Sequence, residues 1–191
     1  LQHYRNIYDQ RYAISRFGSG SHLMAIVDAT EADQEISEEQ FVVINNLEGA
    51  LASLTAGKSD VFYWEKYTTK PYVDSGLLRR VGEFITPWPC FMIAATEGIL
   101  AASPQAVIRM LRVIHDACDT FMGDESNILK VAKRYEQKEK DVAKWFHSTE
   151  WAIHGWINNK MINNVTYHLE VAGIIEERIS PQALIWDRSW L

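Results

Sequence analysis

The sequence predicts an α/β fold, in which parallel strands alternate with helices. Apolar and polar residues alternate over 12–17, as in a strand, and an apolar run that favours a helix follows at 22–27. Two further apolar stretches, at 41–46 and 60–65, are each followed by a short helical pattern. Strands and helices in this order form a parallel sheet with helices on both faces, joined by right-handed crossovers.

The turn between the first strand and the first helix is the strongest candidate for a ligand contact. It consists of Gly18, Ser19, Gly20 and Ser21, which are small residues without bulk. The first N–H groups of the helix and its dipole would face a polar or anionic ligand atom there. The alternative is structural, with Ser21 as an N-cap. The spacing matches neither a dinucleotide-binding motif nor a nucleophile elbow.

The other elements of the first half follow in order. Residues 1–11 are polar and aromatic, which is typical of a connector, and 31–40 are expected to form an acidic loop. A short amphipathic helix at 47–54 is closed by Gly57, which suits the position after a helix. Gly57 also begins a Gly-Lys-Ser triplet, but the first glycine of a P-loop would have to stand where the sequence has Ala52.

A helix is expected within 66–80, with Gly76 near its end, and a fourth strand at 81–85. In parallel sheets of this kind, ligands lie outside the carboxyl ends of the strands. The predicted strand ends are Gly18–Ser21, Asn45–Glu48, Trp64–Thr69 and Thr86–Cys90.

The second half is predicted to be helical. Ser103 and Pro104 form a helix start, after which apolar residues recur at helical spacing. These residues are Val107, Leu111, Ile114, Cys118 and Phe121. Helical spacing continues from Ile128 to about His147, through Trp145 and Phe146, and another helix is expected over Glu150–Val171, ending near Gly173.

A short helix begins at Ser180-Pro181, and Trp186 and Trp190 are expected to dock on the body of the protein. The apolar faces of these helices need a partner surface, yet the predicted sheet already has its own helices. The large side chains of these faces are Val107, Leu111, Ile114, Phe121, Trp145 and Phe146. If all six were left in water, the protein would forgo roughly 10 kcal/mol of stability. We therefore expect self-association through the C-terminal helices if their faces have no other partner.

Composition excludes several classes of function. Hydrophobic residues make up 47% and charged residues 23% of the 191 residues, as in an ordinary globular protein. A net charge of −6 and the lack of a basic stripe argue against nucleic-acid binding. No apolar run approaches the roughly 18 residues of a membrane span. The cysteines, Cys90 and Cys118, are too few to predict a disulfide framework.

Three stretches of the sequence, 14–25, 45–76 and 86–91, resemble a known family. They look like the second lobe of type II periplasmic-binding-protein folds, and in particular ABC-transporter substrate-binding proteins of the thiamine-pyrimidine-precursor type, with relatives in the fungal cytosol. In such proteins two α/β lobes close on a small molecule. The similarity is strong over about 12–95 and loose in the helical remainder.

The resemblance implies a division of the chain. Residues 1–11 would connect to a missing N-terminal part of lobe one, 12–95 would form lobe two, and 96–191 would be helices that return to lobe one. The first lobe of the family begins with about a hundred residues before the crossover, the size of a domain. The chain is therefore expected to lack part of lobe one.

The resemblance also implies site residues. Ser19, Gly20 and Ser21 match the polar ligand contact of the family. Asn45, Asn46 and Glu48 lie at the next strand end, where amides and a carboxylate can recognise a heteroaromatic ring, although helix capping is the alternative for the asparagines and above all for Asn46.

Trp64 and Glu65 follow at the third strand end, where an indole can stack on a planar ligand or pack in the core. Trp88 stands in a stiff Pro-Trp-Pro-Cys loop that would form a hinge or a wall of the cleft.

Catalytic and metal chemistry is not predicted. His147 and His154 lie on one helical face, but no carboxylate completes a metal site, and no cofactor is expected. Relatives that make the thiamine pyrimidine carry a cysteine-rich motif, for which Cys90 alone does not substitute. The prediction is therefore that the protein is not an enzyme.

The predicted function is that of a solute-binding protein for a small polar, heteroaromatic molecule. Its expected partners are this ligand and the membrane subunits of an ABC transporter, which implies a periplasmic or extracytoplasmic location with a possible lipoprotein anchor. The alternatives are a pyrimidine-forming enzyme of the same fold or a ligand-sensing regulatory domain, and a cytoplasmic location.

Overall fold

A computed structural model describes residues 3–152 and 157–186. Its sheet contains the strands β1 (Tyr12–Ile14), β2 (Phe41–Val43) and β3 (Val61–Phe62), in the order β2-β1-β3. Both neighbours pair with β1 in parallel, with Tyr12 opposite Phe41 and Val61. The predicted parallel α/β fold is confirmed, although each strand is shorter than its apolar run.

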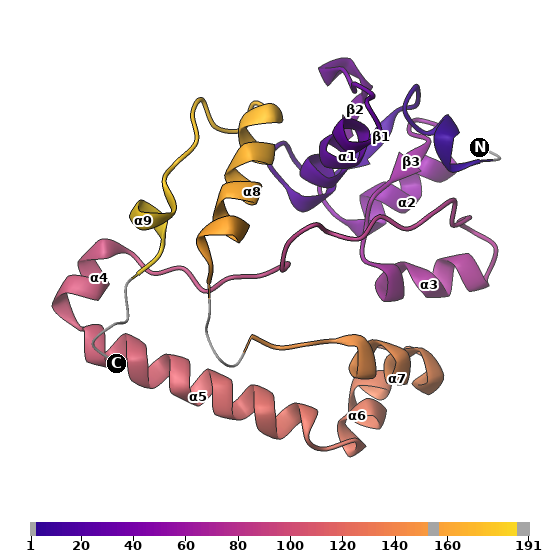
Figure 1. The fold of residues 1–191 in the computed structure, drawn as a ribbon. Coiled ribbons are helices and arrows are strands. Elements are labelled where there is room, and N and C mark those ends of the chain that lie inside the picture. The colour runs from indigo at the N-terminus through magenta and orange to yellow at the C-terminus, as the bar shows by residue number, and fades with distance from the viewer. Residues whose placement is uncertain (1–2, 153–156, 187–191) are drawn as a thin grey trace. The chain divides into compact units, whose positions relative to one another are not determined.

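Helices cover both faces of this sheet (Figure 1). Ala25 of α1 (Gly20–Glu31) packs with Tyr12 and Ile14 on one face. Ala50 of α2 (Leu47–Thr55) packs with Ala13 and Ile44 on the other. Because successive side chains of β1 point to opposite faces, both faces of this strand are buried. The three-layer arrangement is therefore as predicted.

The N-terminal segment is packed into the core of the α/β part. It contains the 3-10 helix η1 (Tyr4–Asn6), and Ile7 is only 1% exposed. Ile7 also accepts a hydrogen bond through its carbonyl from the hydroxyl of Tyr12 at 2.9 Å. Tyr4 donates a hydrogen bond to the buried carboxylate of Asp28 at 2.6 Å. Residues 3–11, expected as a connector, thus form part of the first hydrophobic cluster.

The expected acidic loop at 31–40 contains a second 3-10 helix, η2 (Glu38–Gln40). The side-chain amide of Gln40 donates to the carbonyls of Tyr8 and Gln10, at 2.8 Å in both cases. These two bonds fix the loop to the N-terminal segment.

The predicted helix within 66–80 is shorter in the structure, and the predicted fourth strand at 81–85 is wrong. Helix α3 spans Lys66–Asp74 and ends at a turn where Gly76 has a φ of 78°. Residues 81–85 form neither helix nor strand. Side-chain contacts hold them instead, because Val81 packs against the core and a Cβ on Gly82 would collide with the ring of Tyr4.

Four helices follow between 97 and 148. They are α4 (Glu97–Ala102), α5 (Pro104–Met122), α6 (Ser126–Arg134) and α7 (Glu139–Ser148). The start of α5 at Ser103-Pro104 is confirmed, whereas α4 was not predicted. The helix predicted to continue from 128 to 147 is interrupted where Glu136 has a φ of 52°, a left-handed conformation that ends a helix.

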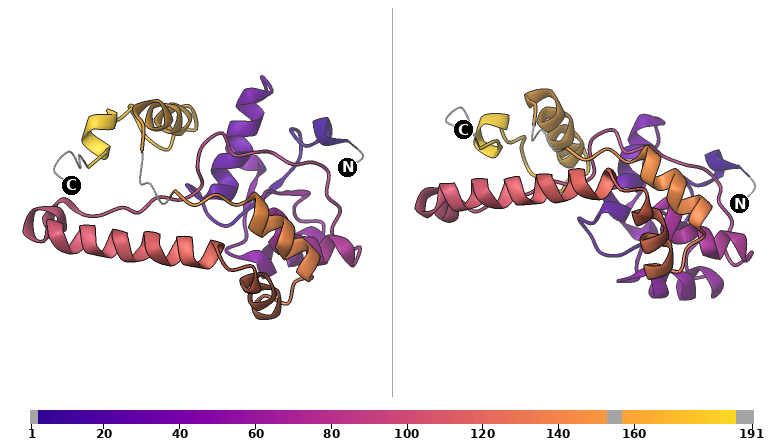
Figure 2. Two further views of the ribbon diagram at one scale, coloured as in Figure 1. Left: turned by 60° about the horizontal axis from the view of Figure 1, so that its bottom comes forward. Right: turned by 90° about the horizontal axis from the view of Figure 1, so that it is seen from below.

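Helices α6 and α7 lie side by side at the end of α5 (Figure 2). Ile128, Ala132, Val142 and Phe146 are buried there, with Phe121 and Trp145 packed against them. The six apolar residues expected to lack a partner surface within the chain are at least partly covered: Val107, Leu111 and Phe146 are buried, and Ile114, Phe121 and Trp145 are half-buried. Burial of these side chains reduces the free-energy cost on which the expected self-association was based. Self-association itself stays a prediction.

The C-terminal part contains α8 (Asn159–Val171) and α9 (Pro181–Leu184). Helix α8 was predicted to begin at Glu150, but 149–152 and 157–158 are not helical. Its end near Gly173 and the short helix at Pro181 are confirmed. Trp186 is half-buried, and Trp190 and His154 lie outside the described residues.

The contacts divide the chain into two compact units, 1–88 with 157–191 and 89–156. Their boundaries differ from the expected division into 1–11, 12–95 and 96–191. That division concerns the lobes of a longer fold, and it stays a prediction.

The close approach of α2 to Ile44, the residue directly after β2, requires a glycine at position 49, because a Cβ there would collide with the backbone oxygen of Ile44. We expect Gly49→Ala to lower the free energy of unfolding by roughly 1–3 kcal/mol, the usual cost of overpacking. Urea denaturation measures this. The matched control is Gly98→Ala in α4, where no atom lies within 4 Å of the new Cβ and stability should hold or rise. Equal effects of the two substitutions would contradict the packing argument.

Candidate functional site

Three strand–helix junctions meet at one edge of the sheet. Because β1, β2 and β3 are parallel, their carboxyl ends share this edge. Helices α1, α2 and α3 each begin a few residues after a strand, with Ser19, Asn46 and Glu65 as their N-caps. The amino ends of three helix dipoles therefore lie at the edge where the sequence placed the ligand.

The side chains of the Gly18–Ser21 loop are engaged within the loop. Ser21 accepts a hydrogen bond from the backbone N–H of Ser15 at 3.0 Å, and the Ser19 and Ser21 hydroxyl oxygens are 3.0 Å apart. Both serines are buried. The N-cap of α1 is Ser19 and not Ser21, since Ser19 Oγ accepts from the backbone N–H of His22.

Gly20 differs from the serines because it is exposed and is the first residue of α1. No atom lies within 4 Å of the position that a Cβ would take there. The open space in front of this loop is therefore in front of Gly20, and a ligand atom could approach the backbone at this point.

At the second junction, the capping alternative for Asn46 is confirmed, because its Oδ1 accepts from the backbone N–H of Gly49 at 2.9 Å. Asn45 has a left-handed φ of 67° and is exposed, as is Glu48. The structure therefore leaves the side chains of Asn45 and Glu48 facing solvent near the end of β2.

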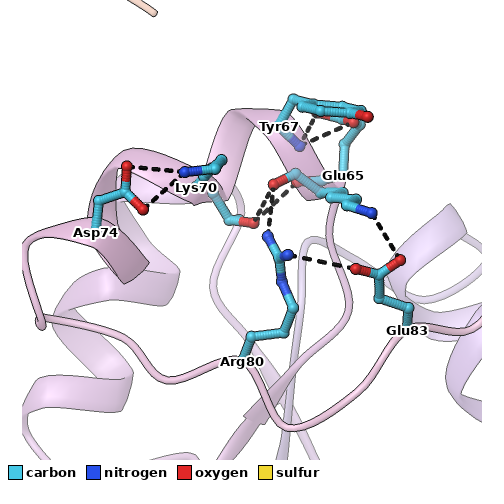
Figure 3. A network of polar contacts seen from close by, with 8 residues as sticks. Glu65, Tyr67, Lys70, Asp74, Arg80 and Glu83 are labelled. Carbon is cyan, nitrogen blue, oxygen red and sulfur yellow. Dashed lines mark hydrogen bonds and ion pairs between the residues drawn. The ribbon is translucent and has the colours of Figure 1, made fainter. Parts of the chain in front are cut away.

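At the third junction, Trp64 is 39% exposed and stacks on Phe62, with the ring centroids 4.9 Å apart. Glu65 caps α3: its carboxylate accepts from the backbone N–H groups of Tyr67 and Thr68, at 2.7 Å for the latter (Figure 3). Glu65 is thus occupied by its own helix, whereas Trp64 presents an aromatic surface to solvent.

Ion pairs join this junction to the segment that follows α3. Lys66 contacts Glu83 at 2.8 Å, and Arg80 bonds both to Glu83 at 3.3 Å and to the backbone oxygen of Lys66 at 3.2 Å (Figure 3). The guanidinium and ammonium groups lower the pKa of Glu83, with the Lys66 hydrogen bond as the largest cause. All three side chains are solvent-exposed, so the network positions the segment more than it stabilises it.

Trp88 is placed elsewhere. Its ring lies 5.3 Å from that of His168 in α8, and Asn164 of α8 donates to the carbonyl of the preceding Pro87. These contacts place Trp88 beside α8. A ligand role for Trp88 stays a prediction.

Two further side chains at these junctions were missed in the sequence. The hydroxyl of Tyr63, directly after β3, donates to Asp28, and burial raises its pKa further above the usual value of 10.0. His22 is buried beside the loop, and its Nδ1 accepts from the backbone N–H of Gly18 at 3.2 Å. The sequence signal for His22 was its position directly after Ser21, next to the predicted ligand loop.

Within residues 3–152 and 157–186, His, Cys, Asp and Glu side chains nowhere form a group of three that could hold a metal ion. In the same ranges, no helix combines the length and the apolar character that a membrane crossing requires.

Comparisons with known proteins agree with this architecture. A family model described as Ca3427-like PBP matches residues 2–84. The CA3427 gene product of Candida albicans is similar in structure with a TM-score of 0.83 and 19% sequence identity, over 100% of this chain and 68% of that one. That gene product is described as defining a new family of proteins that exhibit the generic periplasmic binding protein structural fold. Among curated proteins, none matches the sequence significantly.

The capping role of Glu65 generates a prediction. We expect Glu65→Ala to destabilise the protein by about 0.5–2 kcal/mol, because two backbone N–H groups of α3 lose their acceptor. Glu65→Gln keeps one oxygen acceptor and should lose less. Urea denaturation of both variants measures the difference, and an Ala variant as stable as the parent would mean that the carboxylate does not cap α3.

The order of the sheet, the helices on both its faces and the match over the whole chain lead to one conclusion: this protein has the periplasmic-binding-protein fold that its sequence predicted.

Proposed function

We propose that the protein binds a small, polar, heteroaromatic molecule of the thiamine-precursor kind at the edge formed by its three strand–helix junctions. The observation that supports this most is the convergence there of the amino ends of α1, α2 and α3, beside the open space at Gly20 and the exposed ring of Trp64. The fold, which is shared with periplasmic binding proteins, is consistent with binding at this edge.

The charges at the junctions favour a neutral ligand over an anion. A bare helix amino end attracts phosphate, but each of these helices is already capped by its own side chain. The cap of α3 is a carboxylate, and the exposed Glu48 in the first turn of α2 adds another negative charge. A ring nitrogen or an amino group would be accepted here at lower electrostatic cost than a phosphate.

Two groups could recognise such a ring. The indole of Trp64, held by its stack on Phe62, offers a flat apolar surface, and the amide of Asn45 offers both a donor and an acceptor. Ser19 and Ser21 would act indirectly, by holding the backbone of the loop in place.

Delivery of the bound molecule to the membrane subunits of an ABC transporter is the second part of the proposal. It rests on the resemblance of the sequence to substrate-binding proteins, and it would place the protein outside the cytoplasm. A biosynthetic enzyme or a cytoplasmic sensor of the same fold would bind a similar molecule but would not associate with a transporter.

We expect Gly20→Val to abolish binding of the hydroxymethylpyrimidine precursor of thiamine, because a branched side chain would fill the open space in front of the loop. Folding should be little affected, since a Cβ at this position meets no neighbouring atom within 4 Å. Calorimetric titration measures the affinity, and Gly98→Val, also in open space, is the matched control. An unchanged affinity of the Gly20 variant would exclude this loop as the ligand contact.

A second experiment separates binding from catalysis. Incubation of the protein with iron and a cell extract freed of thiamine pyrimidines should yield no new pyrimidine, because the sequence lacks the cysteine-rich motif of the pyrimidine-forming relatives. Mass spectrometry of the mixture over time provides the measurement. Sustained turnover would instead identify the protein as a biosynthetic enzyme.

A further inference from the structure

His22 is held in one orientation beside the candidate ligand loop. It lies in the first turn of α1, and its side chain is 6% exposed. The rings of Phe17 and Phe41 meet the imidazole edge-on, with centroid distances of 5.2 and 4.7 Å. This aromatic packing leaves the imidazole little freedom to rotate.

Two hydrogen bonds tie His22 to the loop. Its backbone N–H donates to Ser19 Oγ at 3.4 Å, which caps the helix. Its Nδ1 accepts from the backbone N–H of Gly18 at 3.2 Å. Since Nδ1 can accept only when it carries no proton, this bond requires the neutral form of His22 with its hydrogen on Nε2.

The hydrogen bond from the Gly18 N–H to His22 Nδ1 holds the loop backbone at Gly18, where the conformation is unusual. Gly18 has a φ of 72°, a conformation that other residues rarely adopt, and the two residues that follow it are Ser19 and Gly20. If Nδ1 of His22 carried a proton, its N–H would face the backbone N–H of Gly18. Two donors cannot bond to each other, so Gly18 would have to move away. Displacement of Gly18 would shift the open backbone at Gly20.

We propose that His22 is a proton-sensitive positioning residue, whose protonation releases the Gly18 amide and displaces the ligand loop. The consequence for binding rests on the function proposed above: affinity should fall on acidification. The consequence for the loop does not depend on any ligand.

The surroundings of His22 set the pH range in which this occurs. Burial lowers the pKa of His22 below its usual value of 6.5, while the charge of Glu38 in η2 acts in the opposite sense. Phe17 and Phe41 are uncharged, Ser19 and Ser21 of the helix start are neutral, and Arg16, two residues before the loop, is exposed. The stability that the neutral form contributes is thus fully present above pH 6.5 and is lost as the pH falls from there through the pKa of His22 in the folded protein.

The loop can be followed without a ligand by NMR, from about pH 7.5 down to about pH 4.5, across the range in which histidine titrates. We expect the amide resonance of Gly18 and the ring resonances of His22 to change with one shared midpoint. His22→Asn places a non-titrating oxygen near the position of Nδ1, so Gly18 should become insensitive to pH. The control is His168→Asn, which removes the other buried histidine with a lowered pKa and should leave the Gly18 titration unchanged.

The binding arm uses calorimetric titration with the hydroxymethylpyrimidine precursor of thiamine. Affinity should fall about tenfold for each pH unit below the pKa of His22 in the parent and in His168→Asn, but stay constant in His22→Asn. A Gly18 resonance that does not follow His22, or an affinity that is independent of pH in the parent, would overturn the proposal. If no variant binds the precursor at any pH, the proposed function fails, and the NMR titration alone decides the role of His22.

Discussion

The parallel pairing of β1 with a strand on each side is the constraint on which the α/β part depends. Tyr12 and Ile14 point to the α1 face and Ala13 to the α2 face, and none of them is more than 1% exposed. A shift of one residue in register would exchange these faces, so burial holds the register in place. Parallel pairing also places all three strand ends at one edge, which brings three helix starts together there.

These helix starts differ from an open anion-binding site because each is satisfied from within the chain. Ser19, Asn46 and Glu65 supply oxygen acceptors to backbone N–H groups of their own helices. The same contacts that stabilise the helices therefore reduce their attraction for an anion. A ligand at this edge would meet an indole, an exposed amide and the backbone at Gly20, which suits a neutral polar ring.

One buried carboxylate connects this edge to the beginning of the chain. Asp28 of α1 is 5% exposed and receives hydroxyl hydrogen bonds from Tyr4 and Tyr63. Two neutral donors thus offset the cost of burying the charge. Because Tyr4 also packs against Gly82, this cluster joins the N-terminal segment, the third junction and the segment after α3.

Features that depend on near neighbours in the chain could be predicted from the residues alone. Four local signals were of this kind: the alternation over 12–17, the glycine turn at 18–21, the Ser-Pro start of α5 and the capping of α2 by Asn46. They were sufficient for the fold class and for the edge of the sheet at which the candidate site lies.

Features that depend on contacts between distant residues became apparent only in the folded chain. Residues 81–85 have a strand-like pattern, but they pack against Tyr4 and pair through Glu83 instead of joining the sheet. The hydroxyl of Tyr63 turns to Asp28 because the N-terminal segment completes that cluster. The ring of His22 is enclosed by Phe41 from another strand, and no pattern within the first helix could indicate this.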